Sequence, residues 1–321
     1  MYLSLVRDLF GWLMILRNNV IVFLPTWLSA CLTVCLGPHI LDMSFWICPL
    51  YCTLKLLYCY MLHFLFTGKL HSAGTLEGSN EGITSIEFDP TGTKVLAASY
   101  DKSALFWKLD DCAPKFTLTG HSRKVTSAKF KSSLRQAVTG SADRTVKIWD
   151  LQRAACVKTI NVFSFCSDVV CSEYFIVSGH FDKKIRFWDS RAASCTQEVP
   201  LQGKVTSLEI SPDHTQLLSC SRDECLQVID LRMNNIRKSF RAEGFKCGSD
   251  WTKAIFSPDG SYVTAGSSDG AVYVWNVNSG LLETCLPEQH SSSVNAVSWS
   301  LSGEYVVSVD RSRRAVLWSD I

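Results

Sequence analysis

The feature that most constrains the fold is a large apolar residue, usually tryptophan, that recurs from residue 107 to residue 318. The six positions lie 39 to 46 residues apart: Trp107, Trp149, Trp188, Ile229, Trp275 and Trp318. Five of them follow an aspartate by six positions, and those aspartates are Asp101, Asp143, Asp182, Asp223 and Asp269. In the last unit Asp310 lies eight positions before Trp318, so we expect a longer turn there. Such regular spacing indicates one supersecondary unit repeated along the chain.

Each unit contains short β-branched and aromatic runs separated by turn residues, which predicts strands rather than helices. In the second unit the expected strands are 125–130, 136–140, 146–150 and 156–160. A sheet of this kind cannot bury both faces alone, so the units must pack side by side in a ring. The period, combined with Trp149–Asp150 and Trp188–Asp189, is typical of WD repeats. The sequence therefore predicts an all-β fold, a WD40 β-propeller with six recognisable repeats.

The last unit provides only three strands, because the chain ends at Ile321, just after Trp318. We expect residues 73–77, which precede the first unit, to add the fourth strand. This pairing would cover two strand edges that would otherwise be exposed.

Residues 1–70 differ from the rest of the chain and are assigned to a separate hydrophobic segment, with the propeller at 71–321. The segment lacks Glu and Gln and contains a single alanine, Ala30. Its runs Val20–Leu41 and Phe45–Phe66 are marginal candidates for membrane helices, because Pro25, Pro49 and Lys55 interrupt them. Three origins stay open: translated noncoding sequence (a gene-model artefact), membrane insertion, or a hydrophobic contact with the propeller.

Charge and cysteine content argue against several functional classes. Of 32 basic and 30 acidic residues, 4 basic and 2 acidic lie in residues 1–70, so 28 of each sign remain in the predicted propeller. A nucleic-acid partner is disfavoured, because proteins that bind nucleic acids normally carry a surplus of basic residues. The cysteines form no C-x-x-C pair and no zinc-ligand spacing with histidine. We therefore expect reduced thiols, no metal and no cofactor.

His121, Thr139, Asp143 and Trp149 could be mistaken for a catalytic set. None of these four residues lies in a nucleophile elbow G-x-S-x-G, and the phosphate-loop, dinucleotide and H-E-x-x-H motifs are absent from the sequence. In a propeller these four residues are expected to form a buried hydrogen-bonded chain, the structural tetrad. We therefore interpret the protein as one that is not an enzyme and has no catalytic residues.

Several segments go beyond a generic repeat. They are GSNEGITSIEFD (78–89), SGHFDKKIRFWDSR (178–191), LLSCSRD (217–223), VIDLR (228–232), GFKCGSDWTKAIFSPDGSY (244–262) and HSSSVNAVSWS (290–300). Together they resemble the WD-repeat domain of the autophagy-related protein 16-like family. The resemblance covers residues 71–321. The family's conjugate-binding helix and coiled coil have no counterpart here, and its ring has seven repeats.

The resemblance implies a protein-binding scaffold that acts in autophagosome assembly and in lipidation of the autophagy ubiquitin-like modifier. Implied partners are autophagy receptors or membrane-protein tails, and, for full-length relatives, the conjugate of autophagy-related proteins 12 and 5. The implied location is the cytoplasm, at the periphery of autophagosomal or endolysosomal membranes. The alternative is a membrane-anchored WD-repeat scaffold unrelated to autophagy, integral to the membrane if residues 1–70 insert.

A candidate docking surface lies in the third unit and at the start of the fourth. Phe181 follows the second strand of the third unit, and Lys204 precedes the inner strand of the fourth, so both should lie on one face of the ring. Phe181 with Lys183, Lys184 and Lys204 would combine an apolar anchor with a cationic rim, a composition typical of interfaces. The resemblance also marks Phe181 and Lys204 as part of a partner-docking surface. The alternative interpretation is that Phe181 packs inward under its turn and that the lysines only contact solvent.

Overall fold

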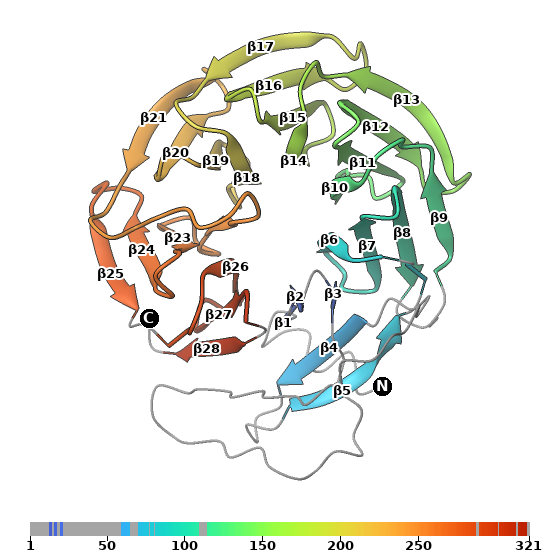
Figure 1. Cartoon of the computed structure of the whole chain (residues 1–321). Coiled ribbons are helices and arrows are strands. Elements are labelled where there is room, and N and C mark those ends of the chain that lie inside the picture. Colours follow the sequence, from blue (N-terminus) through green and yellow to red (C-terminus); the bar gives the residue numbers. More distant parts are fainter. Residues whose placement is uncertain are drawn as a thin grey trace.

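The computed structural model describes residues 78–79, 81–108, 114–286, 289–300, 302–312 and 314–319, together with Leu76 and the backbone of five strands that begin before residue 77. Within this part of the chain every regular element is a β-strand. The sheets stand around a central axis, each with one inner and one outer edge (Figure 1). The predicted all-β propeller is confirmed.

The six predicted units are six successive antiparallel sheets in the described residues. The first is β6 (Ile83–Phe88), β7 (Lys94–Ser99), β8 (Ser103–Lys108) and β9 (Phe116–Thr119). The second is β10 (Val125–Phe130), β11 (Gln136–Ser141), β12 (Thr145–Asp150) and β13 (Ala155–Asn161). The third is β14 (Cys166–Cys171), β15 (Phe175–His180), β16 (Lys184–Asp189) and β17 (Cys195–Pro200).

The remaining three sheets continue the ring. The fourth is β18 (Val205–Ile210), β19 (Gln216–Ser221), β20 (Cys225–Asp230) and β21 (Asn235–Phe240). The fifth is β22 (Ala254–Phe256), β23 (Tyr262–Gly266), β24 (Val272–Asn276) and β25 (Leu282–Leu286). The sixth has three strands, β26 (Val294–Trp299), β27 (Tyr305–Asp310) and β28 (Ala315–Ser319).

Strands that precede the first unit form two further small sheets. These strands are β1 (Leu13–Met14), β2 (Leu16–Arg17), β3 (Val20–Ile21), β4 (Cys59–Phe64) and β5 (Leu70–Leu76). β1, β4 and β5 make one sheet, and β2 pairs with β3. In Figure 1, β4 and β5 lie in the sector between β28 and the first unit. Most residues of the two candidate membrane runs lie outside the described part, and the boundary at residues 70 and 71 stays a prediction.

The predicted closure of the last sheet by residues 73–77 is wrong. β5 pairs with β4 instead, with Cys59 opposite Leu76 and Phe64 opposite Leu70. The sixth sheet ends at β28. β4 and β5 are neighbours in sequence, so their pairing closes a far shorter loop than a pairing of β5 with β28 would, and the entropy cost is correspondingly lower.

A tight turn with an aspartate joins the second and third strands of most units. In the second unit the Asp143 carboxylate accepts a hydrogen bond from the backbone N–H of Thr145 at 2.9 Å. The intervening Arg144 has a φ of 66°, and Lys102, Lys183 and Glu224 repeat this left-handed conformation in three other units. An aspartate that caps the turn two residues ahead is a favoured solution for such geometry. This chemistry explains the repeated aspartates in the sequence.

The apolar core consists of separate clusters, each between two neighbouring sheets. Leu96 and Phe106 of the first sheet pack with Val125 and Trp149 of the second. Corresponding clusters join the second to the third sheet, the third to the fourth, the fourth to the fifth and the fifth to the sixth. Because both faces of the inner strands are covered in this way, short strands with continuous apolar character are stable here.

Three second strands carry a glycine that allows the next sheet to approach closely. A Cβ at Gly179 would lie 2.4 Å from Val205 Cγ1, and one at Gly266 would lie 2.3 Å from Val294 Cγ1. At Gly140 it would lie 2.7 Å from Cys166 Sγ. In each case the contacted residue is the first of the neighbouring inner strand. Glycine at this position therefore sets the spacing between sheets.

Candidate functional site: the structural tetrads and the docking rim

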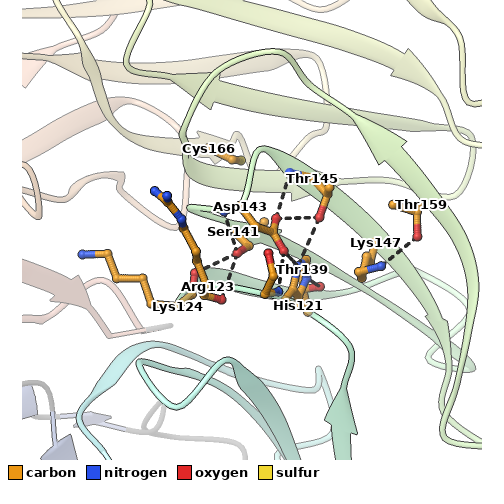
Figure 2. A network of polar contacts seen from close by, with 12 residues as sticks. His121, Arg123, Lys124, Thr139, Ser141, Asp143, Thr145, Lys147, Thr159 and Cys166 are labelled. Carbon is orange, nitrogen blue, oxygen red and sulfur yellow. Dashed lines mark hydrogen bonds and ion pairs between the residues drawn. The ribbon is translucent and has the colours of Figure 1, made fainter.

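His121, Thr139, Asp143 and Trp149 form one hydrogen-bonded chain in the second sheet. Trp149 Nε1 donates to Thr139 Oγ1 at 2.7 Å, and Thr139 lies 2.7 Å from His121 Nε2. His121 Nδ1 lies 2.9 Å from an Asp143 oxygen. Figure 2 shows His121 between Thr139 and Asp143. This geometry fits an imidazole that donates from Nδ1 to Asp143 and accepts from the Thr139 hydroxyl at Nε2.

This set ties the connection before β10 to β11, the next turn and β12. Burial of the Asp143 carboxylate opposes its ionisation, but hydrogen bonds from His121, Thr145 and the backbone N–H of Ser122 outweigh that effect and hold its pKa below the ordinary value. The Thr139 side chain is fully buried, so its hydroxyl cannot attack an external substrate. The chemistry available to the four residues is structural.

The sixth sheet has a second tetrad that the sequence analysis missed. His290 Nε2 lies 2.6 Å from Ser308 Oγ, and His290 Nδ1 lies 3.1 Å from an Asp310 oxygen. Trp318 Nε1 donates to Ser308 at 2.8 Å. The expectation of a longer turn before Trp318 is wrong. Ser308 pairs with Val316, eight residues on, just as Thr139 pairs with Lys147.

Asp310 therefore reaches the histidine from a different position, at the end of β27 and not within the turn. Ser312 stands where the other units have their turn aspartate, and its hydroxyl donates to Asp310 at 2.7 Å. The sequence signal that could have revealed the second tetrad is the distance along the chain from the histidine and from the hydroxyl residue to the tryptophan. In both tetrads the histidine lies 28 residues before it and the hydroxyl 10 residues before it.

The third and fifth sheets depart from the tetrad in different ways. In the third, Trp188 Nε1 donates to Ser178 at 2.7 Å, and His180 Nε2 lies 2.8 Å from the same hydroxyl. His180 is the last residue of β15, so it supplies an imidazole from within the sheet. In the fifth, Ala265 replaces the hydroxyl residue, and Trp275 Nε1 has no hydrogen-bond partner among the described residues. Trp275 packs instead against Phe245 and Tyr273.

Phe181 and Lys204 lie together on the ring face that carries the turns between second and third strands. Lys204 Nζ lies 4.9 Å from the centroid of the Phe181 ring, within the range of a cation–π contact. The Phe181 ring also stacks on Phe165, with ring centroids 4.2 Å apart. Phe181 is half-buried and Lys204 exposed. Phe165 was not among the docking residues predicted from the sequence.

The two other predicted docking residues lie to the side of this pair. Lys183 is exposed at the tip of the turn and has a φ of 65°. Lys184 Nζ lies 2.5 Å from Glu198, which also accepts from Arg186 at 2.7 Å. These hydrogen bonds, first from Lys184 and then from Arg186, lower the pKa of Glu198. Lys184 is thus bonded to the outer strand β17, at the margin of the Phe181 pair.

A backbone hydrogen bond that recurs in the sheets explains which residues line this rim. In five of the six sheets the residue directly after the second strand donates its N–H to a carbonyl in the connection that leads to the inner strand. In the fifth sheet the donor is Ser268, the second residue after β23, and the acceptor is Lys246. Four of these donor–acceptor pairs are Tyr100 to Gly82, Ala142 to Lys124, Phe181 to Phe165 and Arg222 to Lys204. Side chains at these two positions therefore face the same rim. Tyr100, Lys124 and Phe165 could have been found by this rule.

Comparison with known proteins identifies the repeat. The family model for the WD domain, G-beta repeat, matches residues 70–108, 112–150, 194–230, 245–276 and 282–319. The chain belongs to this WD-domain family. The model leaves out residues 151–193, although β14 to β17 form a sheet like the others. The WD propeller thus extends through a unit whose sequence has diverged.

The WD-repeat region is similar to Protein Atg16l2 and to Autophagy-related protein 16, which confirms the resemblance noted in the sequence. It is 60% identical to Protein Atg16l2 of Mus musculus over 251 residues, covering 78% of this chain and 40% of the relative. It is 40% identical to Protein tipD of Dictyostelium discoideum, covering 76% of this chain and 41% of the relative. Autophagy-related protein 16 of Arabidopsis thaliana is 32% identical, with coverage of 76% and 49%. The chain thus spans less than half the length of these curated relatives.

Other candidate sites in the WD propeller are limited. The eight cysteines of the described residues are free thiols. No group of three metal-ligating side chains occurs in the same part of the chain. No described helix has the length and apolar character needed to cross a membrane.

Proposed function

We propose that this WD propeller is a protein-docking module that acts in autophagosome assembly, and that the rim around Phe181 and Lys204 binds the partner. The observation that carries the proposal is the half-buried Phe181 ring, which stacks on Phe165 and makes a cation–π contact with the exposed Lys204. An aromatic anchor next to a lysine that has no carboxylate partner among the described residues has the composition of an interface hot spot. Lys183 at the turn tip and Lys184 at the outer margin extend the cationic rim.

The similarity to autophagy-related proteins of animals, a plant and an amoeba supports the cellular role. On this proposal, the chain is a cytoplasmic scaffold without catalytic residues. It binds autophagy receptors or membrane-protein tails near membranes where the ubiquitin-like modifier is lipidated. Binding of the conjugate of autophagy-related proteins 12 and 5 is proposed only for full-length relatives, because this chain spans less than half of their length.

The test compares proteins recovered from cells with the tagged whole chain and with the double variant Phe181→Ala/Lys204→Ala. The control is Tyr174→Ala, which removes an exposed aromatic residue at the opposite end of β15. We expect recovery of autophagy proteins to fall about tenfold or more in the double variant, with unchanged thermal unfolding. Equal recovery by all three proteins would contradict the docking proposal. If the proteins that the double variant fails to recover include no autophagy proteins, the result would favour a membrane-anchored scaffold unrelated to autophagy.

A further inference from the structure

A second cluster of aromatic and cationic side chains lies on the same rim, around Lys124. Lys124 Nζ lies 4.5 Å from the centroid of the Tyr100 ring and 4.8 Å from that of Trp251. It also donates to the Tyr100 hydroxyl at 3.3 Å. The Tyr100 and Trp251 rings are 6.0 Å apart and tilted by 45°, so they form two walls around one ammonium group. Such an arrangement is an aromatic cage.

Three distant segments build this cage. Tyr100 follows β7, Lys124 precedes β10, and Trp251 lies in the connection between β21 and β22. That connection extends toward the centre of the ring in Figure 1. Its position is fixed by Arg222, which pairs with Asp250 at 3.5 Å and donates to the Cys247 carbonyl. The cage therefore joins the first, second and fifth units across the ring face.

The cage is continuous with the Phe181 pair. Lys124 Nζ lies 5.7 Å from the centroid of Phe165, and Phe165 stacks on Phe181, which carries Lys204. The rim thus presents a cation, two stacked rings and a second cation in order. Tyr100, Lys124, Phe165, Phe181 and Trp251 are all half-buried, and Lys204 is exposed, so the row faces solvent along its length.

The charges on this row are not neutralised within the described part of the propeller. Neither Lys124 nor Lys204 has a carboxylate within ion-pair distance there, whereas the nearby Arg222, Arg241 and Arg186 are paired with Asp250, Asp223 and Asp182. Two ammonium groups without carboxylate partners among the described residues favour a partner that brings carboxylates. The stacked rings between them offer apolar contact and no hydrogen-bonding group.

We propose that the docking surface is bipartite and binds an extended protein segment with one carboxylate at Lys124, another at Lys204 and an apolar side chain over the Phe165–Phe181 pair. This inference rests on the proposed function, because it specifies what the Phe181 rim recognises. It adds the Lys124 cage as a second subsite and makes the partner segment acidic at two separated positions.

The test is a selection of random 12-residue displayed peptides against the folded whole chain, followed by affinity measurements with the enriched peptides. We expect enriched peptides to contain two acidic residues flanking an apolar one. Replacement of one glutamate by glutamine should weaken binding about tenfold, the size of one charged contact. In the variant Lys124→Met, the glutamate-to-glutamine change at the peptide position that faces Lys124 should have little further effect. In Lys204→Met, the same should hold for the peptide position that faces Lys204.

The outcomes separate this inference from the proposed function. If Lys124→Met binds every peptide as the unchanged chain does, while Phe181→Ala loses binding, the second subsite is wrong and the docking rim stands. If neither change alters binding, both proposals fail. Recovery of no acidic peptide also overturns the second subsite. Lys124→Gln serves as a second uncharged variant if Lys124→Met unfolds, and Tyr174→Ala controls for general surface effects.

Discussion

His180 shows how one residue changes the polar chemistry of a whole sheet. Its imidazole bonds to the Ser178 hydroxyl that also accepts from Trp188, so it replaces the histidine that other sheets supply from the preceding connection. The position is fully buried, and no carboxylate accepts from this ring within the described residues. Burial, followed by the charge of Arg186, lowers the pKa of His180 from 6.5 to about 4. The folded protein therefore holds this histidine neutral.

This shift predicts a loss of stability in mild acid. Between pH 6.5 and pH 4 the unfolded chain binds a proton at His180 that the folded protein does not, so unfolding becomes easier as the pH falls. By pH 4 the loss amounts to ~3 kcal/mol from this one residue. Urea unfolding of the unchanged chain and of His180→Gln, measured at several pH values, checks it. The variant should lose less stability in acid, and parallel curves would refute the assignment.

The residues that could be predicted were those at fixed distances from a tryptophan. The set of His121, Thr139, Asp143 and Trp149 was visible because all four positions carry the usual residue type. Asp310 was misread because it reaches His290 from the end of a strand, and such an approach depends on side-chain direction and not on spacing. The Lys124 cage escaped for a related reason. Trp251 is brought to Tyr100 by the path of a long connection, which no periodicity encodes.

At the scale of the elements, close approach of adjacent sheets depends on glycine in the second strand. Gly179 lies against Val205, the first residue of the next inner strand, with no space for a methyl group. The neighbouring fourth sheet cannot retreat freely, because its other face packs on the fifth sheet. A bulkier residue here must therefore strain the contact between the third and fourth sheets.

We predict that Gly179→Ala lowers the free energy of unfolding by about 1–3 kcal/mol. The contact is specific, so Val205→Ala in the same chain should relieve the clash. The double variant should then be more stable than the sum of the two single changes implies. Chemical denaturation of all four proteins measures this coupling. Strict additivity would show that Gly179 is required for a reason other than contact with Val205.

Among the elements, the six sheets were predictable and the pairing of β5 was not. Alternation, turn aspartates and tryptophan spacing are local signals, and they gave the strands of the second unit to within one or two residues. The choice between β4 and β28 as partner for β5 is a competition between a nearby and a distant strand. Sequence pattern alone cannot weigh these two loop lengths against the contacts that each pairing gains.

At the scale of the whole molecule, one ion pair joins two units of the ring that are not adjacent. Lys253 Nζ, in the connection before β22, lies 2.6 Å from Asp168 on β14, 85 residues away. The Asp168 side chain is almost fully buried and also accepts from the backbone N–H groups of Val169 and Leu208. The third, fourth and fifth units therefore share one carboxylate near the axis.

Removal of the lysine should leave that carboxylate buried without its countercharge. We predict that Lys253→Met lowers the free energy of unfolding by about 2–4 kcal/mol, since a buried ion pair that loses one partner is strongly destabilised. Asp168→Asn in the same chain should restore part of this loss. Thermal and urea unfolding of the single and double variants measure the effect. A double variant no more stable than Lys253→Met alone would contradict this explanation.

The division of the core into clusters between neighbouring sheets has a consequence for how such a protein can diversify. No apolar cluster spans more than two neighbouring sheets in the described residues, so a substitution in one cluster disturbs two units and leaves the others intact. The loops above each pair of sheets can therefore change their recognition chemistry one at a time. Related rings could acquire new binding preferences step by step, without losing the scaffold that displays them.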